Sequence, residues 1–231
     1  MTVLSAIQNA CSVIGLTKPD AVYSSTAREH FELQVLANTC GDHIAKDYEW
    51  QELKALATIS GDDSATAFSL PSDYDRMLKD AKLWSDRLIT PLTHVTSTDE
   101  WLELDIRQFD FVVGAWTLLA NQINIKPAPI TGESVKYYYM VSKWALDEAS
   151  SAQPSFTADS DTFRLSEKLL ELCIIWKWRA QKGLPYAQDQ DNYENEKEKL
   201  ITRNQGSRIL TVGRPRISRG AQIAYPVPIT P

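Results

Sequence analysis

The chain has 231 residues, of which 43% are hydrophobic, enough to bury a core and to exclude a protein that is disordered throughout. Its formal net charge of −6 argues against a protein whose main role is to grip nucleic acid, because such proteins carry a large positive excess. Runs of about 18 apolar residues are absent and the first residues lack a basic flank, so we expect a protein made in the cytoplasm without a membrane span.

Two amphipathic helices are predicted at the N-terminus. The apolar positions of the first recur at three- and four-residue steps between Thr2 and Gly15: Val3, Leu4, Ile7, Cys11 and Ile14. In the second, Thr26 and Glu29 form a capping box, and the helix is predicted to run to about Tyr48. Its apolar stripe consists of Phe31, Val35, Leu36, Cys40 and Ile44. We expect these two helices to pack together.

The next part of the chain alternates in hydrophobicity and predicts strands. Alternation over 53–59, a turn at Gly61-Asp62-Asp63 and further alternation in "TAFSLP" predict a β-hairpin. The sequence "PSDYDRM" (71–77) is predicted as a turn. Short strands are expected around 81–84 and 88–95, followed by a short helix around 99–106 that Ser97 or Thr98 caps.

Three strand-like runs follow between residues 115 and 144. They are separated by Ala120-Asn121 and by a turn over 127–132. Within "VKYYYMV", Tyr137 and Tyr139 lie on one face and Tyr138 on the other, which is typical of sheet packing.

The C-terminal region predicts two more helices. The sequence "DSDTFRLSEKLLELCIIWKWRAQKG" predicts a helix ending at Gly183, with one apolar side formed by Phe163, Leu165, Leu169, Leu172, Ile175 and Trp176. Because Trp176 and Trp178 lie two residues apart, we expect one in the core and the other at a surface or interface. Pro185 starts a more exposed helix that ends near Gly206. Its few apolar positions are Tyr193 and Leu200.

These elements predict an α+β fold. N- and C-terminal helices form a helical bundle with a β-rich insertion, and an extended C-terminal arm follows. The predicted division is 1–50 for the N-terminal helices, 51–155 for the insertion with its short helix, 156–206 for the C-terminal helices and 207–231 for the arm.

No motif predicts catalysis, a cofactor or a metal. The sequence lacks a G-x-S-x-G elbow, a Walker lysine loop and a G-x-G-x-x-G loop. His30, His43 and His94 lack metal-ligand spacing. The cysteines, Cys11, Cys40 and Cys173, are interpreted as small core residues in a reducing compartment. We therefore expect a protein that is not an enzyme.

Two pairs of carboxylates leave an alternative open. The sequences "SDYDR" (72–76) and "QDQDN" (188–192) each place two aspartates two residues apart, a pattern that could hold Mg²⁺ or serve as acid and base. The favoured interpretation is a turn with backbone-capping aspartates and a solvated helix start.

The last residues differ from the rest in charge and in proline content. Residues 201–231 contain five arginines and no acid, so with −6 on the whole chain the first 200 residues carry −11. Four prolines, Pro215, Pro226, Pro228 and Pro231, favour extended backbone. Such a segment cannot bury its own apolar side chains, which favours an arm that adds a strand to, or docks in a groove of, an acidic partner. A disordered tail is the alternative. The predicted binding residues are Arg208, Ile209, Leu210, Val212, Arg214, Arg216, Ile217, Arg219, Ile223, Tyr225, Val227 and Ile229.

Three stretches carry a resemblance to a known family: "TVLSAIQNACSVIGL", "YEWQELKALATISGDDSATAFSLPSDYDRMLKDAKLW" and "TGESVKYYYMVSKWA", the last followed by the two terminal helices. Up to about Gly206 the chain resembles the head-to-tail adaptor (connector) proteins of tailed bacteriophages and related prophages. The resemblance implies a dodecameric ring beneath the portal protein, a helical bundle with a β-containing insertion, and a C-terminal extension that reaches the portal. It also implies a location in the virion neck, a tail or nozzle protein below the ring, and a channel through which double-stranded DNA passes without specific binding.

The acidic body fits such a channel, because carboxylates repel the phosphates of passing DNA. The candidate channel-lining residues are Asp189, Asp191, Glu194, Glu196 and Glu198 of the exposed terminal helix. Two alternatives remain: a neck or tail-completion protein one layer lower, and a phage cell-wall hydrolase that pairs an acid near 99–103 with Asp73 or Asp75.

Overall fold

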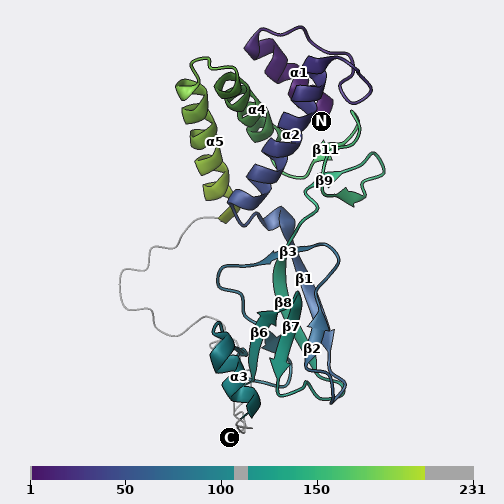
Figure 1. Cartoon of the computed structure of the whole chain (residues 1–231), viewed down its shortest axis with the longest axis vertical. Coiled ribbons are helices and arrows are strands. Elements are labelled where there is room, and N and C mark those ends of the chain that lie inside the picture. The colour runs from purple at the N-terminus through teal and green to yellow at the C-terminus, as the bar shows by residue number, and fades with distance from the viewer. Residues whose placement is uncertain (1, 107–113, 206–231) are drawn as a thin grey trace, which may run out of the picture.

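The computed structural model describes residues 2–106 and 114–205, which form a helical half and a β half, one above the other in Figure 1. The helical half contains α1 (Val3–Ile14), α2 (Arg28–Asp47), α4 (Glu167–Gln181) and α5 (Ala187–Gln205). Helices from both ends of the chain therefore pack together, and β-sheet lies between them in sequence. The predicted α+β fold class is confirmed.

Helix α1 has the predicted bounds and both predicted end signals. The Thr2 hydroxyl accepts a hydrogen bond from the Ser5 backbone N–H at 3.4 Å, which satisfies one free amide of the first turn. Gly15 ends the helix in the left-handed conformation, at φ +88°, which glycine adopts without steric cost.

Helix α2 begins differently from the prediction. Its N-cap is Ala27, which provides no side-chain hydrogen bond, so the predicted capping box of Thr26 and Glu29 is wrong. The Ser25 hydroxyl instead accepts from the Ala27 N–H at 3.2 Å and contacts His30 Nδ1 at 2.7 Å. The side chain that organises this start therefore lies one residue earlier than predicted.

The buried stripe of α2 also differs from the predicted one. Phe31 and Val35 are exposed, whereas the buried side consists of Leu33, Leu36, Ala37, Cys40, Gly41, Ile44 and Ala45. Leu33 and Phe31 are two residues apart and so point to nearly opposite sides of the helix. Once Leu33 faces the core, Phe31 must face away from it.

Helix α4 is the centre of the helical half. It packs against α1, α2 and α5, and it buries Leu169, Leu170, Glu171, Cys173, Ile174, Ile175 and Trp178. Because it is covered on several sides, its apolar residues are not confined to one stripe. Helices α1 and α2 touch each other less and pack mainly on α4, so the expected packing of these two is largely indirect.

Several side chains lie where the sequence predicted. Trp178 is buried and Trp176 is half-buried, Tyr193 of α5 is fully buried, and all three cysteines are free and buried. The prediction that the cysteines are small core residues is confirmed.

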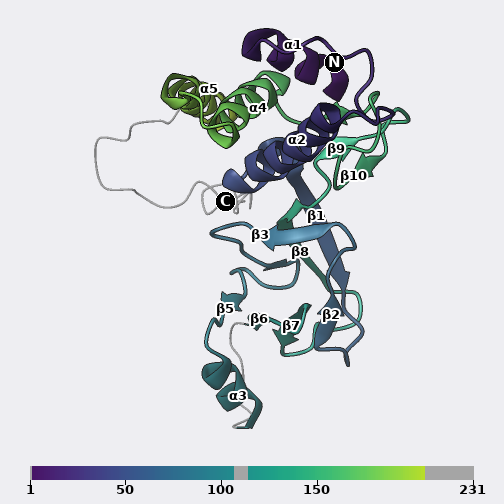
Figure 2. The same cartoon turned by 45° about the horizontal axis from the view of Figure 1, so that its top comes forward.

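The β half contains two four-stranded sheets. One has the order β1 (Lys54–Ser60), β8 (Ser134–Val141), β3 (Tyr74–Met77), and β4 (Trp84–Ser85) pairs with β8 as well. The other has the order β2 (Ala67–Ser69), β7 (Gln122–Lys126), β6 (Ala115–Leu119), β5 (Thr93–His94). All pairs are antiparallel except β5 with β6. A small sheet of β10 (Ala152–Gln153), β9 (Ala145–Leu146) and β11 (Thr162–Phe163) lies beside α2 rather than in the β half (Figure 2).

The predicted hairpin is wrong in its pairing. Strands β1 and β2 exist, but β1 pairs with β8 and β2 with β7, in different sheets. The chain does turn at Asp62 and Asp63: Asp62 accepts hydrogen bonds from the backbone N–H groups of Ser64 and Ala65, and the Asp63 N–H donates to the Pro129 carbonyl. This turn thus docks onto the distant loop at Pro129 instead of closing a hairpin.

The sequence "PSDYDRM" is only partly a turn. The Tyr74 N–H donates to the Pro71 carbonyl at 3.0 Å, but residues from Tyr74 onward form β3, so the prediction of a turn up to Met77 is wrong. Pairing with β8 organises these residues as a strand, and that partner lies about 65 residues further along the chain.

The strands predicted around 81–84 and 88–95 are present only as the two-residue strands β4 and β5, whereas the other predicted elements of the β half are found. Ala120 and Asn121 both have positive φ, as a two-residue turn between β6 and β7 requires. The short helix α3 (Thr98–Ile106) is capped by Ser97, whose hydroxyl accepts from the Glu100 N–H at 3.4 Å.

Candidate assembly surfaces

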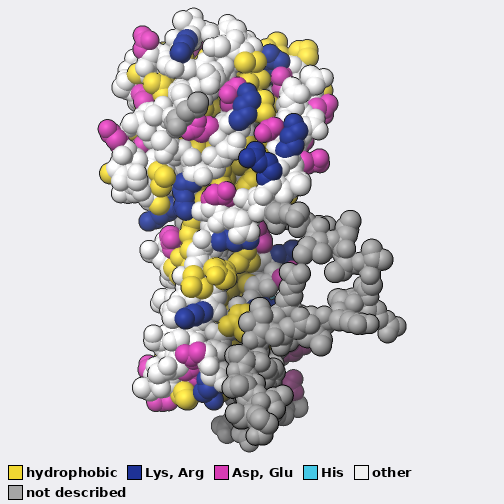
Figure 3. Space-filling model, turned by 180° about the vertical axis from the view of Figure 1, so that it is seen from behind, with side chains coloured by type: hydrophobic (Ala, Val, Ile, Leu, Met, Phe, Trp, Pro, Cys, Tyr) yellow, Lys and Arg dark blue, Asp and Glu magenta, His cyan; other side chains and the backbone are white. Residues whose placement is uncertain are grey.

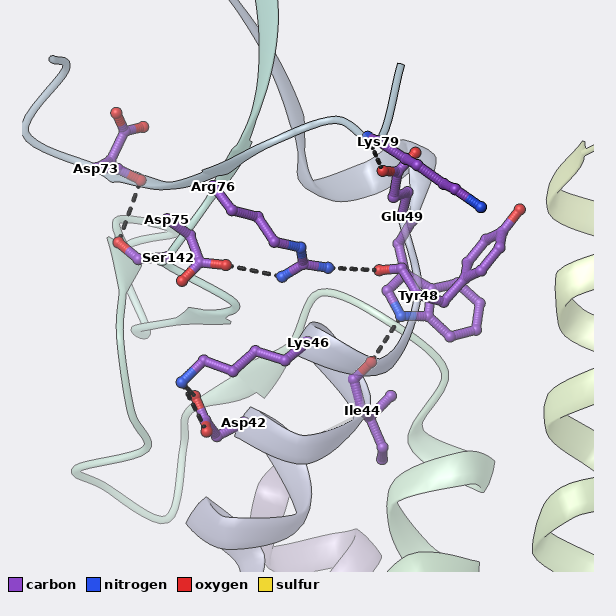
Figure 4. Close-up of polar contacts among 11 residues, drawn as sticks. Asp42, Ile44, Lys46, Tyr48, Glu49, Asp73, Asp75, Arg76, Lys79 and Ser142 are labelled. Carbon is purple, nitrogen blue, oxygen red and sulfur yellow. Dashed lines mark hydrogen bonds and ion pairs between the residues drawn. The ribbon is translucent and has the colours of Figure 1, made fainter. Parts of the chain in front are cut away.

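The two halves meet at a junction built from the end of α2, the single-turn helix η1 (Gln51–Leu53) and β3. Figure 4 shows Arg76 of β3 spanning this junction: its guanidinium donates to the Tyr48 carbonyl at 3.2 Å and to Asp75 at 2.7 Å. The buried Trp50 donates through Nε1 to the Ile44 carbonyl at 2.7 Å, which holds the chain against the end of α2. These contacts connect the helical half to the β half.

The end of α5 is attached to the same junction. The Asn204 side chain accepts from the Gln51 N–H at 3.0 Å and donates to the Glu52 carboxylate at 2.9 Å. Arg164 donates to the Glu52 carbonyl at 2.6 Å and to the Lys143 carbonyl at 2.8 Å. The described part of the chain therefore ends at the middle of the molecule.

The predicted arm lies outside the described residues, with all twelve of its predicted binding residues from Arg208 to Ile229. Their role stays a prediction. The described part of the chain fixes where the arm starts, directly after α5 at the junction.

The five candidate channel-lining acids lie on α5 in different environments. Asp189 is largely buried against Arg179 of α4 and pairs with it. Glu194 pairs with Lys197 at 2.5 Å and Glu196 with Lys199 at 3.6 Å, while Asp191 and Glu198 are exposed. Lys197 also pairs with Asp47 of α2 at 2.9 Å. Asp191 and Glu198 are therefore the candidates with the most solvent exposure, and the channel role of all five stays a prediction.

One face of the β1–β8–β4 sheet carries large exposed hydrophobic side chains. Leu56 of β1 pairs with Tyr138 of β8, and Trp84 of β4 pairs with Lys136 of β8. Paired residues share a face, and residues two apart on a strand return to it, so these four side chains lie together on the outer face. Leu56 is 53% exposed and Tyr138 57% exposed. Figure 3 shows a group of hydrophobic side chains on the β half just below the helices, with Lys or Arg beside it.

This outer face forms an open groove of about 610 Å³. Besides Leu56, Trp84 and Tyr138, its lining includes three lysines and two acids: Lys79, Lys82, Lys136, Glu49 and Asp80. The groove is thus apolar at its base and slightly basic at its rim.

Helix α3 is a second exposed feature of the β half. Trp101 is half-buried and lies under the Lys126 ammonium, 4.7 Å from the ring centroid, which attaches the helix to β7. Leu102 and Ile106, one turn apart, are 54% and 72% exposed. The segment Thr98–Ile106 contains four acids and no base.

The carboxylates of the hydrolase alternative are not brought together. Asp73 accepts from the Tyr139 hydroxyl at 2.8 Å and Asp75 pairs with Arg76, both near the junction. Figures 1 and 2 place α3, with Asp99 and Glu103, at the opposite end of the β half. Among the described residues, no group of three or more His, Cys, Asp or Glu side chains could hold a metal ion.

Sequence reasoning missed the groove, although one signal for it was present. The apolar alternation used to predict β1 consists of Leu53, Ala55, Ala57 and Ile59. Leu56 has the opposite phase and must lie on the other face. Its partner Tyr138 and the contribution of Trp84 depend on pairing with β8, which the sequence did not reveal.

No helix within the described ranges, 2–106 and 114–205, is long and apolar enough to cross a membrane. A comparison with curated proteins finds no match. The model of one protein family, described as SU10 adaptor protein, matches residues 1–219, nearly the whole chain.

Proposed function

The chain belongs to the SU10 adaptor protein family, a family of phage head-to-tail adaptors, and we propose on that basis that it forms a dodecameric ring in the virion neck. In this proposal the ring joins the portal protein to a tail or nozzle protein and extends the channel for double-stranded DNA. The observation that carries the proposal is the family match over residues 1–219. The adaptor family is a structural family and not an enzyme family, and in this proposal the chain acts by connecting other proteins.

We propose that residues 207–231 bind the portal. Support comes from their sequence, which combines four arginines with evenly spread apolar residues and prolines. Further support comes from the attachment of α5 at the junction, which starts the arm at the middle of the molecule. Arginine pairs well with carboxylates, so an acidic or carboxylate-lined portal surface is the expected partner.

We propose that the acids of α5 line the channel, with Asp191 and Glu198 contributing most because they are exposed. Carboxylates on the wall repel DNA phosphates and let the duplex slide. The division into 1–50, 51–155, 156–206 and 207–231 also stays part of the proposal, with the first and third segments forming the helical bundle.

Deleting residues 207–231 tests the adaptor role. We expect the shortened chain to fold with an unchanged far-ultraviolet circular dichroism spectrum and to lose binding to portal rings, measured by light scattering of the mixture. A matched control replaces Arg208, Arg214, Arg216 and Arg219 with glutamine and keeps the apolar residues, which separates charge from chain length. Normal joining of heads to tails by the shortened chain would contradict the proposal, and binding only to a tail protein would favour the tail-completion alternative.

A further inference from the structure

The β half carries two exposed features of opposite character that do not contact each other within the described chain. One is the groove over β1, β8 and β4, with Leu56, Trp84 and Tyr138 at its base. The other is α3, with Leu102 and Ile106 on its outer side. Exposed hydrophobic side chains of this size, when they gather in a patch, mark surfaces that a partner covers.

The two features complement each other in charge. Lys79, Lys82 and Lys136 lie at the groove and outnumber Glu49 and Asp80. One of those acids is partly engaged, because the Glu49 carboxylate accepts from the Lys79 backbone N–H at 2.5 Å. Helix α3 carries Asp99 and Glu100 in its first turn and no basic residue. An acidic helix on a groove with a basic rim brings opposite charges together, which favours correct encounter over incorrect ones.

The spacing of the apolar side chains on α3 also suits a groove. An amphipathic helix binds an apolar groove through residues spaced by three or four positions, and Leu102 and Ile106 have that spacing. Trp101 contacts Lys126 of its own chain, so α3 is fixed with Leu102 and Ile106 turned away from its own sheet. These two side chains are thus available for contact with another molecule.

We propose that α3 of one copy docks into the β1–β8–β4 groove of a second copy. This contact uses two different patches of the same chain, so a pair of copies still has a free groove on one copy and a free helix on the other. Such a heterologous contact continues from copy to copy and closes into a ring when the rotation per copy divides a full turn. The proposal rests on the ring of the proposed function and identifies its contact.

Two one-sided variants test the contact. Leu102→Asp disrupts the docking surface of α3 and leaves the groove intact. Leu56→Asp disrupts the groove and leaves α3 intact. We expect each variant alone to self-associate at least about tenfold more weakly than the wild type, because burial of one leucine is worth about that factor. We expect an equimolar mixture to form a 1:1 complex that grows no further, since it contains one intact helix and one intact groove. Sedimentation velocity measures all three samples.

Control measurements distinguish loss of this contact from loss of folding and from loss of portal binding. Phe31→Ser changes a side chain of similar exposure on α2, 62% exposed, and should leave self-association unchanged. Circular dichroism spectra of all variants should match the wild type. A wild-type chain that remains monomeric up to its solubility limit, or a mixture without a 1:1 complex, would overturn the proposal. Because portal binding by the arm is measured separately, a chain that joins heads but forms no 1:1 complex would keep its adaptor role and lose only this contact.

Discussion

The helical half and the β half differ in how far they bury their large apolar side chains. In the helical half, α4 lies at the centre and is covered by α1, α2 and α5, so residues such as Ile174 and Tyr193 are completely buried. In the β half, Trp101 of α3 lies under Lys126 of β7, and the outer face of the β1–β8–β4 sheet leaves Leu56, Trp84 and Tyr138 exposed. The difference teaches that the central helix of one half is covered on several sides, while the other half leaves a cluster of large apolar side chains in water on one face of a sheet.

The largest expected effect tests the helical half directly. Ile174→Ala should lower the free energy of unfolding by about 2–5 kcal/mol, because it opens a cavity in a core that is covered on several sides. The matched change in the β half, Leu102→Ala, should alter it by less than about 0.5 kcal/mol, since this side chain is already in water. Urea denaturation followed by circular dichroism measures both, and equal losses would erase the proposed contrast between the halves.

A second prediction concerns a buried carboxylate that holds the β half together. Glu133 accepts hydrogen bonds from the Ser85 hydroxyl, from the Arg87 guanidinium at 2.9 Å and from the Ile130 N–H at 3.1 Å. Glu133→Gln should lower the free energy of unfolding by about 1–3 kcal/mol, because charged hydrogen bonds are lost in a buried site. A loss comparable to that of Ile174→Ala would show that the β half depends on polar contacts as strongly as the helical half depends on its core.

The same carboxylate gives this loss a pH dependence. Burial raises the pKa of Glu133, but the hydrogen bonds from Ser85, Ile130 and Arg87 lower it by more, so its pKa lies below the ordinary value. A depressed pKa in the folded state stabilises the fold above the ordinary glutamate pKa of about 4.3, and this contribution disappears as the pH falls through the folded pKa. The difference in the free energy of unfolding between the wild type and Glu133→Gln should therefore become smaller as the pH falls. A difference independent of pH would assign the loss to packing instead.

A smaller effect is expected at the junction. Arg76→Ala removes the hydrogen bond to the Tyr48 carbonyl and the pair with Asp75, and should lower stability by about 1 kcal/mol. Arg28→Ala, which removes the exposed pair with Glu32, serves as the control and should have almost no effect. Hydrogen exchange at residues 48–51 should accelerate only in the Arg76 variant. Unchanged exchange there would mean that the halves are held together by other contacts.

The smallest expected effect separates two acids of α5. Asp189→Asn removes the pair with Arg179 and should cost up to about 1 kcal/mol, whereas Asp191→Asn should remain within about 0.5 kcal/mol. Thermal unfolding compares them. Equal effects would show that the Asp189 pair does not stabilise the packing of α5 on α4.

The helices could be predicted more fully than the sheets, for a physical reason. A helix is specified by neighbours three and four residues apart, so the bounds of α1 follow from Thr2, Gly15 and the apolar spacing between them. The side of α2 that is buried was predicted wrongly, because Phe31 and Leu33 are both apolar and only packing on α4 decides between them. Local sequence therefore sets the existence of a helix more firmly than its orientation.

Strand pairing depends on partners that local patterns do not identify. β1 was predicted as a strand, but its partner β8 begins more than 70 residues later, and the turn after β1 favoured a hairpin that does not form. The groove was missed for the same reason, since Leu56, Trp84 and Tyr138 come from three strands that only pairing brings together. Of these three residues, only Leu56 could be placed from the sequence, because it alternates with the residues of β1 that were predicted to be buried.

The attachment of Asn204 to Gln51 and Glu52 has a mechanical consequence. Tension transmitted along the chain from beyond residue 205 would act on the protein at the junction between the two halves, beside the first residues of β1, and not at either end of the molecule. Because the hydrogen bonds of Asn204 are exposed to solvent, they would break before the buried apolar core of the helical half was strained.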